Sequence, residues 1–306
     1  MSKILITGGQ GFLGKRTAEI LSEMGHEVTC FDIAPINKTE GKNLPYKKTL
    51  GSILNSLDVD RAMKRCDIVV HFAAMVGVRI TEKKSLDCLH INIQGTSNVL
   101  DAAVKNKVKK IIFSSSSEVY GEQEKFPIFE DANLTPKSNY GISKIVGEEY
   151  VKAYNKLYDI KFNICRFFNL YGPDQKEDFV IPKFAGHIKK NETIKVYGDG
   201  KQIRSYCYID DAVKGIINIL EKGKDNTTYN VGNDLEPISV IDLANKMVMV
   251  SKKKIKIEKV PFEQSDRGSN REIYRREPSV EKLRKETGYT PKVKLEAGIK
   301  EILAKI

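Results

Sequence analysis

The chain has 306 residues, of which 41% are hydrophobic and 30% charged, and it carries a formal net charge of +11. This length allows a large core and one or two domains, and this composition is typical of a soluble globular protein. No apolar run approaches the roughly 20 residues of a membrane-spanning helix, so we expect no membrane segment.

The basic residues are spread over predicted helix faces and short runs such as residues 252–254, so we interpret them as a solvated surface. No nucleic-acid-binding signature accompanies the charge, and we expect no nucleic-acid partner. A positive field would instead attract a small anionic substrate. Because the N-terminus enters a predicted strand without an apolar leader, and the five cysteines form no CxxC pair, we expect a cytoplasmic protein with reduced thiols. The four dispersed histidines predict no metal site.

The first predicted elements are a strand over residues 3–7, a glycine-rich turn over residues 8–14 and an amphipathic helix to about residue 24. Glycines permit positive φ and let a pyrophosphate approach the backbone, while the helix N-terminus supplies unpaired amides and a favourable dipole. A second strand over residues 28–31 ends in Asp32, where a carboxylate would accept hydrogen bonds from an adenosine ribose. No arginine follows Asp32, so the pattern favours NAD over NADP.

Strands and helices continue to alternate along the first half of the chain. Predicted strands cover residues 46–50, 67–74, 110–113 and 161–168, and predicted helices cover residues 55–65 and 86–106 and begin again near residue 140. This alternation predicts a parallel, doubly wound α/β sheet of the Rossmann type, in which ligands lie beyond the carboxyl ends of the strands. The glycine turn, Asp32, the small pair Ala73-Ala74 and the serines after residue 113 all fall at such ends.

The alternating pattern loosens after about residue 170. We expect a turn at residues 169–173, helices at 181–190, 210–222 and 240–249, strands at 194–197, 228–231 and 255–260, and two terminal helices. Asp210 is the predicted N-cap of its helix. These elements predict an NAD-binding domain over residues 1–170 and a smaller C-terminal α/β lobe over residues 171–306, interleaved with the first. The cleft between them is the expected substrate site.

A serine, a phenol and an ammonium group are predicted to meet at one strand end. An apolar run over residues 111–113 leads into four serines, and Tyr140 and Lys144 lie one turn apart in the next predicted helix. Hydride leaves a carbinol carbon only if its hydroxyl proton is removed, and a phenol with a pKa of about 10 is a poor base at neutral pH. Lys144, as a cation beside Tyr140, would lower that pKa. The alternative interpretation of this pair is an ordinary exposed helix face.

Motifs along essentially the whole chain resemble the extended short-chain dehydrogenase/reductase family that acts on nucleotide-linked sugars. Besides the serine run and the Tyr140–Lys144 pair, they are Thr7 to Gly14, His71-Phe72-Ala73-Ala74, Asn92 with Gly95-Thr96, Arg166 to Pro173, and Tyr197 to Asp211. The resemblance implies a bound NAD that oxidises C4 of the sugar and so gives a 4-keto intermediate. It also implies that Ser116 hydrogen-bonds the same sugar oxygen as Tyr140.

Glu118 lies two residues beyond Ser116 at the same predicted strand end. In the resembling family, 4-epimerases usually carry a small neutral residue there, whereas dehydratases and UDP-glucuronate decarboxylase carry glutamate. The dTDP-glucose dehydratases also place an aspartate immediately before it, where this chain has Ser117. The resemblance therefore favours a decarboxylase or a GDP-mannose-type 4,6-dehydratase. The alternative interpretation of Glu118 is an ion pair with a surface cation.

The resemblance implies three sets of site residues. The catalytic set is Ser116, Glu118, Tyr140 and Lys144. The cofactor-binding set is Gly8, Gly11, Phe12, Leu13, Gly14, Asp32, Ser52, Ile53, Phe72, Ala73, Ala74, Tyr140 and Lys144, with Ser52 standing where the family often has an aspartate that binds adenine. The substrate-binding set is Asn169, Arg204, Arg271 and Arg275, with Arg267 and Arg276 as further cations nearby.

We therefore predict an NAD-dependent enzyme that oxidises a nucleotide-diphosphate hexose at C4 and then dehydrates, decarboxylates or epimerises the 4-keto intermediate. Two alternatives stay open: a net 4-dehydrogenase or 4-keto reductase, and a non-catalytic NAD-binding regulator on the same fold. The resemblance also implies a homodimer in which helices around residues 86–105 and 140–157 pair across a two-fold axis. Their apolar periodicity is equally compatible with an ordinary core.

Overall fold

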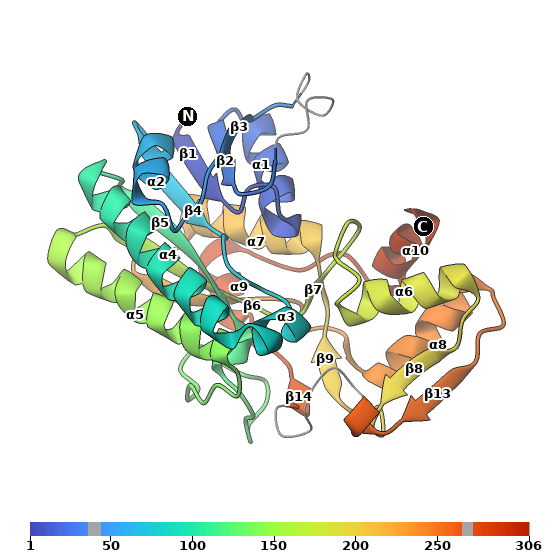
Figure 1. Ribbon diagram of the computed structural model, residues 1–306. Helices are drawn as coiled ribbons and strands as arrows, with labels where there is room; N and C mark the ends of the chain where they lie inside the picture. Colours follow the sequence, from blue (N-terminus) through green and yellow to red (C-terminus); the bar gives the residue numbers. More distant parts are fainter. Residues whose placement is uncertain (36–43, 265–271, 306) are drawn as a thin grey trace.

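A computed structural model describes residues 1–35, 44–264 and 272–305, and a seven-stranded parallel sheet lies at its centre (Figure 1). The strand order is β11-β6-β5-β4-β1-β2-β3. These strands are β1 (Lys3–Thr7), β2 (Glu27–Asp32), β3 (Lys47–Leu50), β4 (Ile68–His71), β5 (Lys110–Ser116), β6 (Lys161–Phe167) and β11 (Thr227–Val231). The chain reverses its direction of travel across the sheet between β1 and β4, which is where doubly wound sheets bind ligands. The predicted fold class is confirmed.

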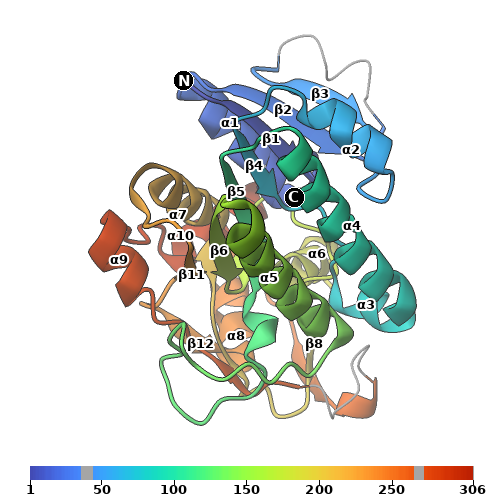
Figure 2. The same ribbon diagram turned by 90° about the vertical axis from the view of Figure 1, so that its left-hand side faces the viewer.

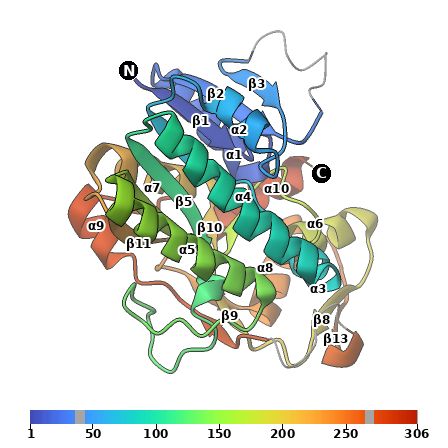
Figure 3. The same cartoon turned by 60° about the vertical axis from the view of Figure 1, so that its left-hand side comes forward.

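Helices cover both faces of this sheet (Figures 2 and 3). One face carries α1 (Phe12–Glu23) and α7 (Ile209–Lys222), and the other carries α2 (Ser56–Met63), α4 (Ser85–Lys105) and α5 (Asn139–Tyr158). Alternate residues of β1 divide between the two cores: Ile4 and Ile6 pack with α1 and α7, whereas Leu5 packs with α2 and α4. Because both faces are buried, the central strands are continuous apolar runs, which made them easy to predict.

The smaller lobe is built from short sheets and helices. A three-stranded sheet contains β12 (Pro237–Ser239), β9 (Ile203–Ser205) and β14 (Arg275–Arg276); β8 (Ile194–Tyr197) pairs with β13 (Ile257–Val260), and β7 (Leu170–Tyr171) pairs with β10 (Cys207–Tyr208). The other helical elements of this part of the chain are α6 (Val180–Lys190), α8 (Val240–Ser251), the 3₁₀ turn Phe262–Gln264 and α10 (Leu295–Lys305), whereas α9 (Glu281–Thr287) packs against α7 and β11 of the main sheet. Since β11 lies in the main sheet, the chain beyond residue 170 contributes to both parts. The domain boundary at residue 170 stays a prediction.

Asp210 is not the N-cap of α7, so that prediction was wrong. The helix begins at Ile209 directly after β10, and Tyr208 occupies the N-cap position without a side-chain hydrogen bond. Asp210 lies in the first turn, where its two carboxylate oxygens accept hydrogen bonds from the Arg16 guanidinium at 2.6 and 3.1 Å. It therefore joins α7 to α1 instead of capping its own helix.

Several short elements were not predicted from the sequence, and β7 and α3 are two of them. Strand β7 lies inside the segment that was predicted as a turn over residues 169–173. Helix α3 (Val78–Lys83) has only six residues and follows Gly77, which provides no side-chain cap. Neither element is long enough to show an apolar period, so only the tertiary structure reveals them.

No helix in the described parts of the chain is long and apolar enough to span a membrane. The cysteines are free thiols, four of them buried and Cys66 partly exposed. Burial raises the pKa of the Cys30 thiol to about 12 and that of Cys66 to about 11. These thiols are protonated at neutral pH and act as small apolar groups of the core.

Candidate active site

The glycine turn packs against the end of a neighbouring strand. Gly8 has a φ of +68°, and a Cβ atom there would lie 2.7 Å from the backbone nitrogen of Ala73. A Cβ atom at Gly14 would lie 2.2 Å from the carbonyl oxygen of Gly8. Neither position has room for a side chain, because the turn packs against the segment after β4 at Gly8 and the first turn of α1 packs against the turn at Gly14.

Asp32 ends β2 beside this turn. Its Oδ2 atom accepts a hydrogen bond from the backbone nitrogen of Gln10 at 2.9 Å, and its Oδ1 atom accepts one from Ala34 at 3.0 Å. Each oxygen keeps a lone pair for a further donor. Gly11, the N-cap of α1, offers no side-chain acceptor, so the amides of the first turn, which begins at Phe12, are open to an anion.

The segment after β3 lies on the same edge of the sheet. Ile53 is 6% exposed and its carbonyl oxygen accepts a hydrogen bond from Asn98 at 2.9 Å. The Ser52 hydroxyl oxygen accepts from the Leu54 amide at 3.2 Å, while the Ser52 amide donates to Asp58 at 3.4 Å. A hydroxyl oxygen can accept a second hydrogen bond, so Ser52 can still act as the predicted acceptor for adenine.

The remaining predicted cofactor residues surround the same strand ends. Leu13 is partly buried in the first turn of α1, and Phe72, Ala73 and Ala74 directly follow β4 and are all partly exposed. Phe72 packs edge-on against Phe167, with ring centroids 6.4 Å apart. A dinucleotide fits this place. Gly8 and Gly14 let it approach the backbone, the amides at the start of α1 are open to its phosphates, and the Asp32 carboxylate can accept further hydrogen bonds.

His71 connects these strand ends through a buried chain of hydrogen bonds that sequence reasoning missed. The Thr7 hydroxyl accepts a hydrogen bond from the Ala73 amide at 3.3 Å, and its oxygen lies 2.7 Å from His71 Nδ1. Since the Thr96 hydroxyl donates to the Asn92 carbonyl oxygen, it accepts from His71 Nε2 at 3.1 Å. Burial, aided by the nearby Lys144 ammonium, lowers the pKa of His71 to about 3. His71 is therefore a neutral connector and not an acid or a base.

Ser116, Tyr140 and Lys144 converge at the carboxyl end of β5. Ser116 is the last residue of that strand, and its side chain hydrogen-bonds the Tyr140 phenol at the start of α5. Ser138 fixes this end of α5 as its N-cap. The Lys144 Nζ atom donates to the Ser114 carbonyl oxygen at 2.7 Å and lies 5.6 Å from the centroid of the Tyr140 ring. The structure thus brings these three predicted residues together.

The predicted effect of Lys144 on the Tyr140 phenol was wrong for this structure. Burial raises the pKa of Tyr140 above its usual value of 10; the Glu118 carboxylate raises it further, and the Ser116 hydrogen bond only partly opposes them. The Lys144 ammonium group is directed at the Ser114 carbonyl oxygen, 2.7 Å away. Burial also lowers the pKa of Lys144 to about 8.

Glu118 binds a buried arginine that comes from the far end of the chain. It lies in the 3₁₀ turn η1 (Ser117–Val119), and its Oε1 atom accepts a hydrogen bond from Arg276 Nη1 at 2.6 Å. The same Arg276 nitrogen donates to the Ser117 hydroxyl at 3.3 Å, and Ser138 donates to Glu118 Oε2 at 3.4 Å. Arg276 Nε is buried and has no hydrogen-bond partner among the described residues. A guanidinium group with a free donor therefore stands beside the catalytic candidates.

Arg275, one of the four predicted substrate-binding residues, does not lie beside Glu118 and Arg276. Neighbouring residues of a strand face opposite sides, and Arg275 is directed away from Arg276. It pairs with Glu277 at 2.8 Å and lies over the Phe126 ring, 4.5 Å from its centroid. The alternation of side chains along β14 could have indicated Arg276, but a strand of two residues is too short to be recognised from the sequence. Arg271 lies outside the described residues.

Arg204 and Asn169 lie on the lobe side of the site. Arg204 is the register partner of Arg276 in the adjacent parallel strand β9. Its Nη2 atom donates to Glu272 at 2.8 Å, and both side chains are buried. Asn169 has a φ of +38°, and its Nδ2 atom donates to the Ser205 carbonyl oxygen at 3.3 Å. Two arginines thus stand side by side on one face of this small sheet.

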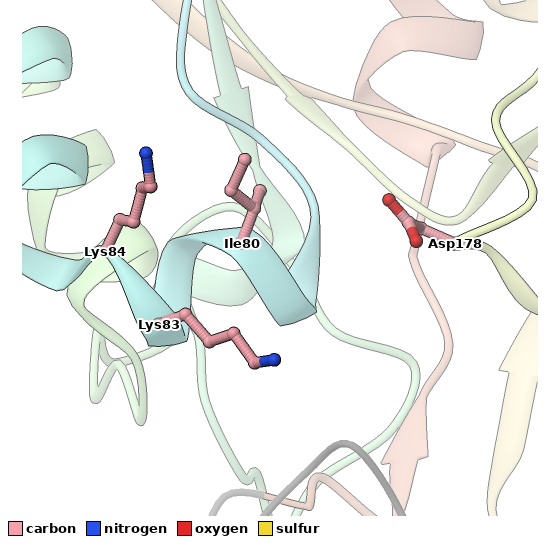
Figure 4. Close-up of a pocket in the computed structure, with 4 residues that line it drawn as sticks. All are labelled: Ile80, Lys83, Lys84 and Asp178. Carbon is pink, nitrogen blue, oxygen red and sulfur yellow. The ribbon is translucent and has the colours of Figure 1, made fainter.

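A hollow lies between α3 and the segment that precedes α6 (Figure 4). Ile80, Lys83 and Lys84 line it from α3 and the residue that follows, and Asp178 faces them from the other side. The two lysines make the α3 side of the hollow positive, which favours the approach of an anionic ligand.

Comparisons with known proteins agree with this geometry. The family model described as "NAD dependent epimerase/dehydratase family" matches residues 4–232. The chain is 35% identical to a UDP-N-acetyl-alpha-D-glucosaminuronate decarboxylase of Bacillus cytotoxicus, over 98% of this chain and 96% of that protein. It is also similar to the crystal structure of the Thermotoga maritima UDP-glucose 4-epimerase with UDP-glucose, with a TM-score of 0.89, 30% identity, and 99% and 97% of the two chains covered. The Bacillus cereus UDP-glucuronic acid 4-epimerase, in complex with UDP-glucuronic acid and NAD, gives a TM-score of 0.89, 27% identity and 99% coverage of both chains.

Proposed function

The chain belongs to the NAD dependent epimerase/dehydratase family, and from this premise we propose that it decarboxylates a nucleotide-linked uronic acid after oxidation at C4. The observation that carries the proposal is Arg276, a buried guanidinium group beside Ser117 and Glu118 with one donor left unpaired. A planar guanidinium suits a carboxylate, because two parallel N–H groups can bind its two oxygens. The relative from Bacillus cytotoxicus is named as a decarboxylase of such a sugar, which supports the proposal.

The catalytic residues would act first at C4. NAD, the cofactor of this family, is the hydride acceptor when bound. Tyr140 removes the proton of the C4 hydroxyl, and Ser116 orients that hydroxyl by a hydrogen bond. Lys144 supplies the positive charge that tyrosinate requires, although burial and Glu118 oppose ionisation of the phenol in this structure. Substrate and cofactor must therefore change the surroundings of the phenol before it can act as a base.

Arg276 would act on the C6 carboxylate, which is attached to C5 next to C4. Oxidation at C4 places a ketone two carbons from the C6 carboxylate. The bond from C5 to the carboxylate carbon then breaks, carbon dioxide leaves, and the electron pair moves into an enolate that is protonated at C5. Return of the hydride to C4 would complete the reaction, so that the net change is the loss of carbon dioxide. Arg276 orients the carboxylate for this step, and Glu118 and Ser117 orient Arg276. The nucleotide diphosphate would lie towards Arg204 and Asn169, which we propose as its ligands together with Arg271.

A second candidate is 4-epimerisation of the same class of sugar. It is favoured by the structural similarity to an epimerase in complex with UDP-glucuronic acid and NAD, because such an enzyme also recognises the carboxylate. The two reactions differ in the fate of C6. Decarboxylation removes that carbon, whereas epimerisation keeps it and inverts only C4.

Product masses separate these reactions. We expect the protein, incubated with NAD and a panel of UDP-, GDP- and dTDP-linked sugars, to act on those that carry a C6 carboxylate and to form products that lack carbon dioxide. Loss of water would indicate a dehydratase, loss of two hydrogens a net dehydrogenase, and an unchanged mass with altered NMR couplings an epimerase. The matched neutral hexoses serve as controls, and faster turnover of these hexoses would contradict the role of Arg276.

We also propose that the protein is a cytoplasmic homodimer that pairs through α4 and α5. Large apolar side chains are exposed on these adjacent helices, among them Leu86 at 80% and Leu157 at 70%. Burying such groups between two copies would remove apolar area from water. Light scattering at micromolar concentration is expected to give the mass of two chains. A monomer mass, or a dimer that is unaffected by Leu157→Glu, would contradict this interface.

A further inference from the structure

Two residues of α5, one turn apart, are held by consecutive residues of β5. The Lys144 ammonium group donates to the Ser114 carbonyl oxygen at 2.7 Å. The Ser115 hydroxyl donates to the Glu148 Oε1 atom at 2.5 Å. These two contacts fix the register of α5 against the strand that ends in Ser116, and both lie in the interior, with Glu148 fully buried and Lys144 only 4% exposed.

Arg166 clamps the Glu148 carboxylate from β6. Its Nε atom donates to Glu148 Oε1 at 2.9 Å and its Nη2 atom donates to Oε2 at 2.7 Å, so the pair is bidentate. Arg166 is itself held by the Tyr120 hydroxyl and the Glu130 carbonyl oxygen, each 2.9 Å from its Nη1 atom. A carboxylate held in this way keeps its position one turn from Lys144, and burial leaves it poorly screened.

Glu148 is the carboxylate on the helix of Lys144 itself, one turn away, and it is paired with Arg166. The titratable and charged groups around Lys144 come from four elements besides η1: Tyr140 and Glu148 from α5, Cys88 from α4, His71 from β4 and Arg166 from β6. His71 is neutral and Cys88 is a buried thiol. The Glu118 carboxylate, in η1, is already bound to Arg276.

We infer that Glu148 is a positioning residue whose clamped carboxylate keeps the Lys144 ammonium charged and in place at the Ser114 carbonyl. The inference rests on the proposed function only for the role of Lys144 in the reaction. Burial favours the neutral amine, and a fixed negative charge one turn away opposes that loss. Glu148 touches neither the expected substrate nor the expected cofactor, so its effect reaches the reaction only through Lys144.

Titration of Lys144 in the NAD-bound protein tests the inference with two matched variants. Glu148→Gln removes the charge and keeps the shape, whereas Ser115→Ala removes one hydrogen bond to the carboxylate and no charge. The protein is labelled with ¹³C at the lysine Cε atoms, and the Lys144 signal is assigned with Lys144→Arg. We expect Glu148→Gln to lower the pKa of Lys144 by about one unit, and Ser115→Ala to leave it within a few tenths of the wild-type value. The basic limb of the kcat–pH profile should move to lower pH by the same amount.

An unchanged Lys144 pKa in Glu148→Gln, or an equal shift in both variants, would overturn the inference. If Glu148→Gln does not fold, the double variant Glu148→Gln/Arg166→Gln replaces the ion pair with an amide pair and is titrated instead. A lowered Lys144 pKa in the double variant supports the inference, and the wild-type value overturns it. The NMR titration needs no turnover, so it stays decisive even if the uronic acid proves not to be the substrate.

Discussion

Replacing Tyr140 with phenylalanine is expected to lower kcat by roughly 100- to 10,000-fold, the usual contribution of a positioned acid–base group. The variant keeps the aromatic ring beside Ser116 and Lys144 and loses only the hydroxyl that would take the C4 proton. Its affinity for NAD should change little, because the glycine cradle and the Asp32 carboxylate are untouched. Initial rates and NAD binding by calorimetry measure the two effects separately.

Tyr158→Phe is the matched control for this variant. Tyr158 ends the same helix, is 54% exposed, and should tolerate the loss of its hydroxyl with kcat within a factor of two. Equal activity of Tyr140→Phe and the wild type would show that another group removes the proton. Loss of NAD binding together with activity would instead indicate that the phenol acts mainly in cofactor binding.

Replacing Arg276 with glutamine is expected to raise KM for a nucleotide-linked uronic acid roughly 100-fold, equivalent to about 3 kcal/mol. The substitution removes the cation beside Ser117 and Glu118 while keeping a polar side chain of moderate length. A neutral hexose has no carboxylate for Arg276 to bind, so its KM should change far less. Steady-state kinetics with both sugars measure this difference.

Arg275→Gln provides a control of the same chemistry on the adjacent residue. Arg275 is directed to the opposite side of β14, where it pairs with Glu277, so its loss should leave KM within about twofold. The same effect of both substitutions would show that net charge, and not the position of Arg276, governs binding. An unchanged KM in Arg276→Gln would show that Arg276 does not bind the carboxylate, and it would contradict the proposed decarboxylation.

The parts of the fold that local pattern determines were predictable from the sequence. Strand β1 was predicted with its observed bounds, and β4 was recognised, because a strand buried on both faces is a short apolar run between polar turns. The N-cap of α7 was mistaken, since the pattern of Asp210 before an apolar helix is the same whether its carboxylate caps the helix or binds Arg16. Only the tertiary contact with α1 distinguishes the two.

The candidate site was predictable where its residues lie close together in sequence. Tyr140 and Lys144 are separated by one helical turn, and Ser116 and Glu118 share one strand end, so spacing placed them in two groups. The family resemblance was needed to select Ser116 from the four serines. Arg276 comes from a two-residue strand far along the chain, and its contact with Glu118 depends on pairing between β14 and β9. The raised pKa of Tyr140 likewise could not be predicted from the sequence, because it depends on the burial of the phenol and on its distance from Glu118.

The fate of C6 tests the proposed function most directly. The protein is incubated with NAD and a nucleotide-linked uronic acid that carries ¹³C at C6, and the label is followed by NMR. We predict that the label appears as carbon dioxide and bicarbonate, at a rate that falls sharply in Tyr140→Phe and in Arg276→Gln. Retention of the label in a sugar that has been converted at C4 would contradict the proposal and assign the reaction to epimerisation or net oxidation.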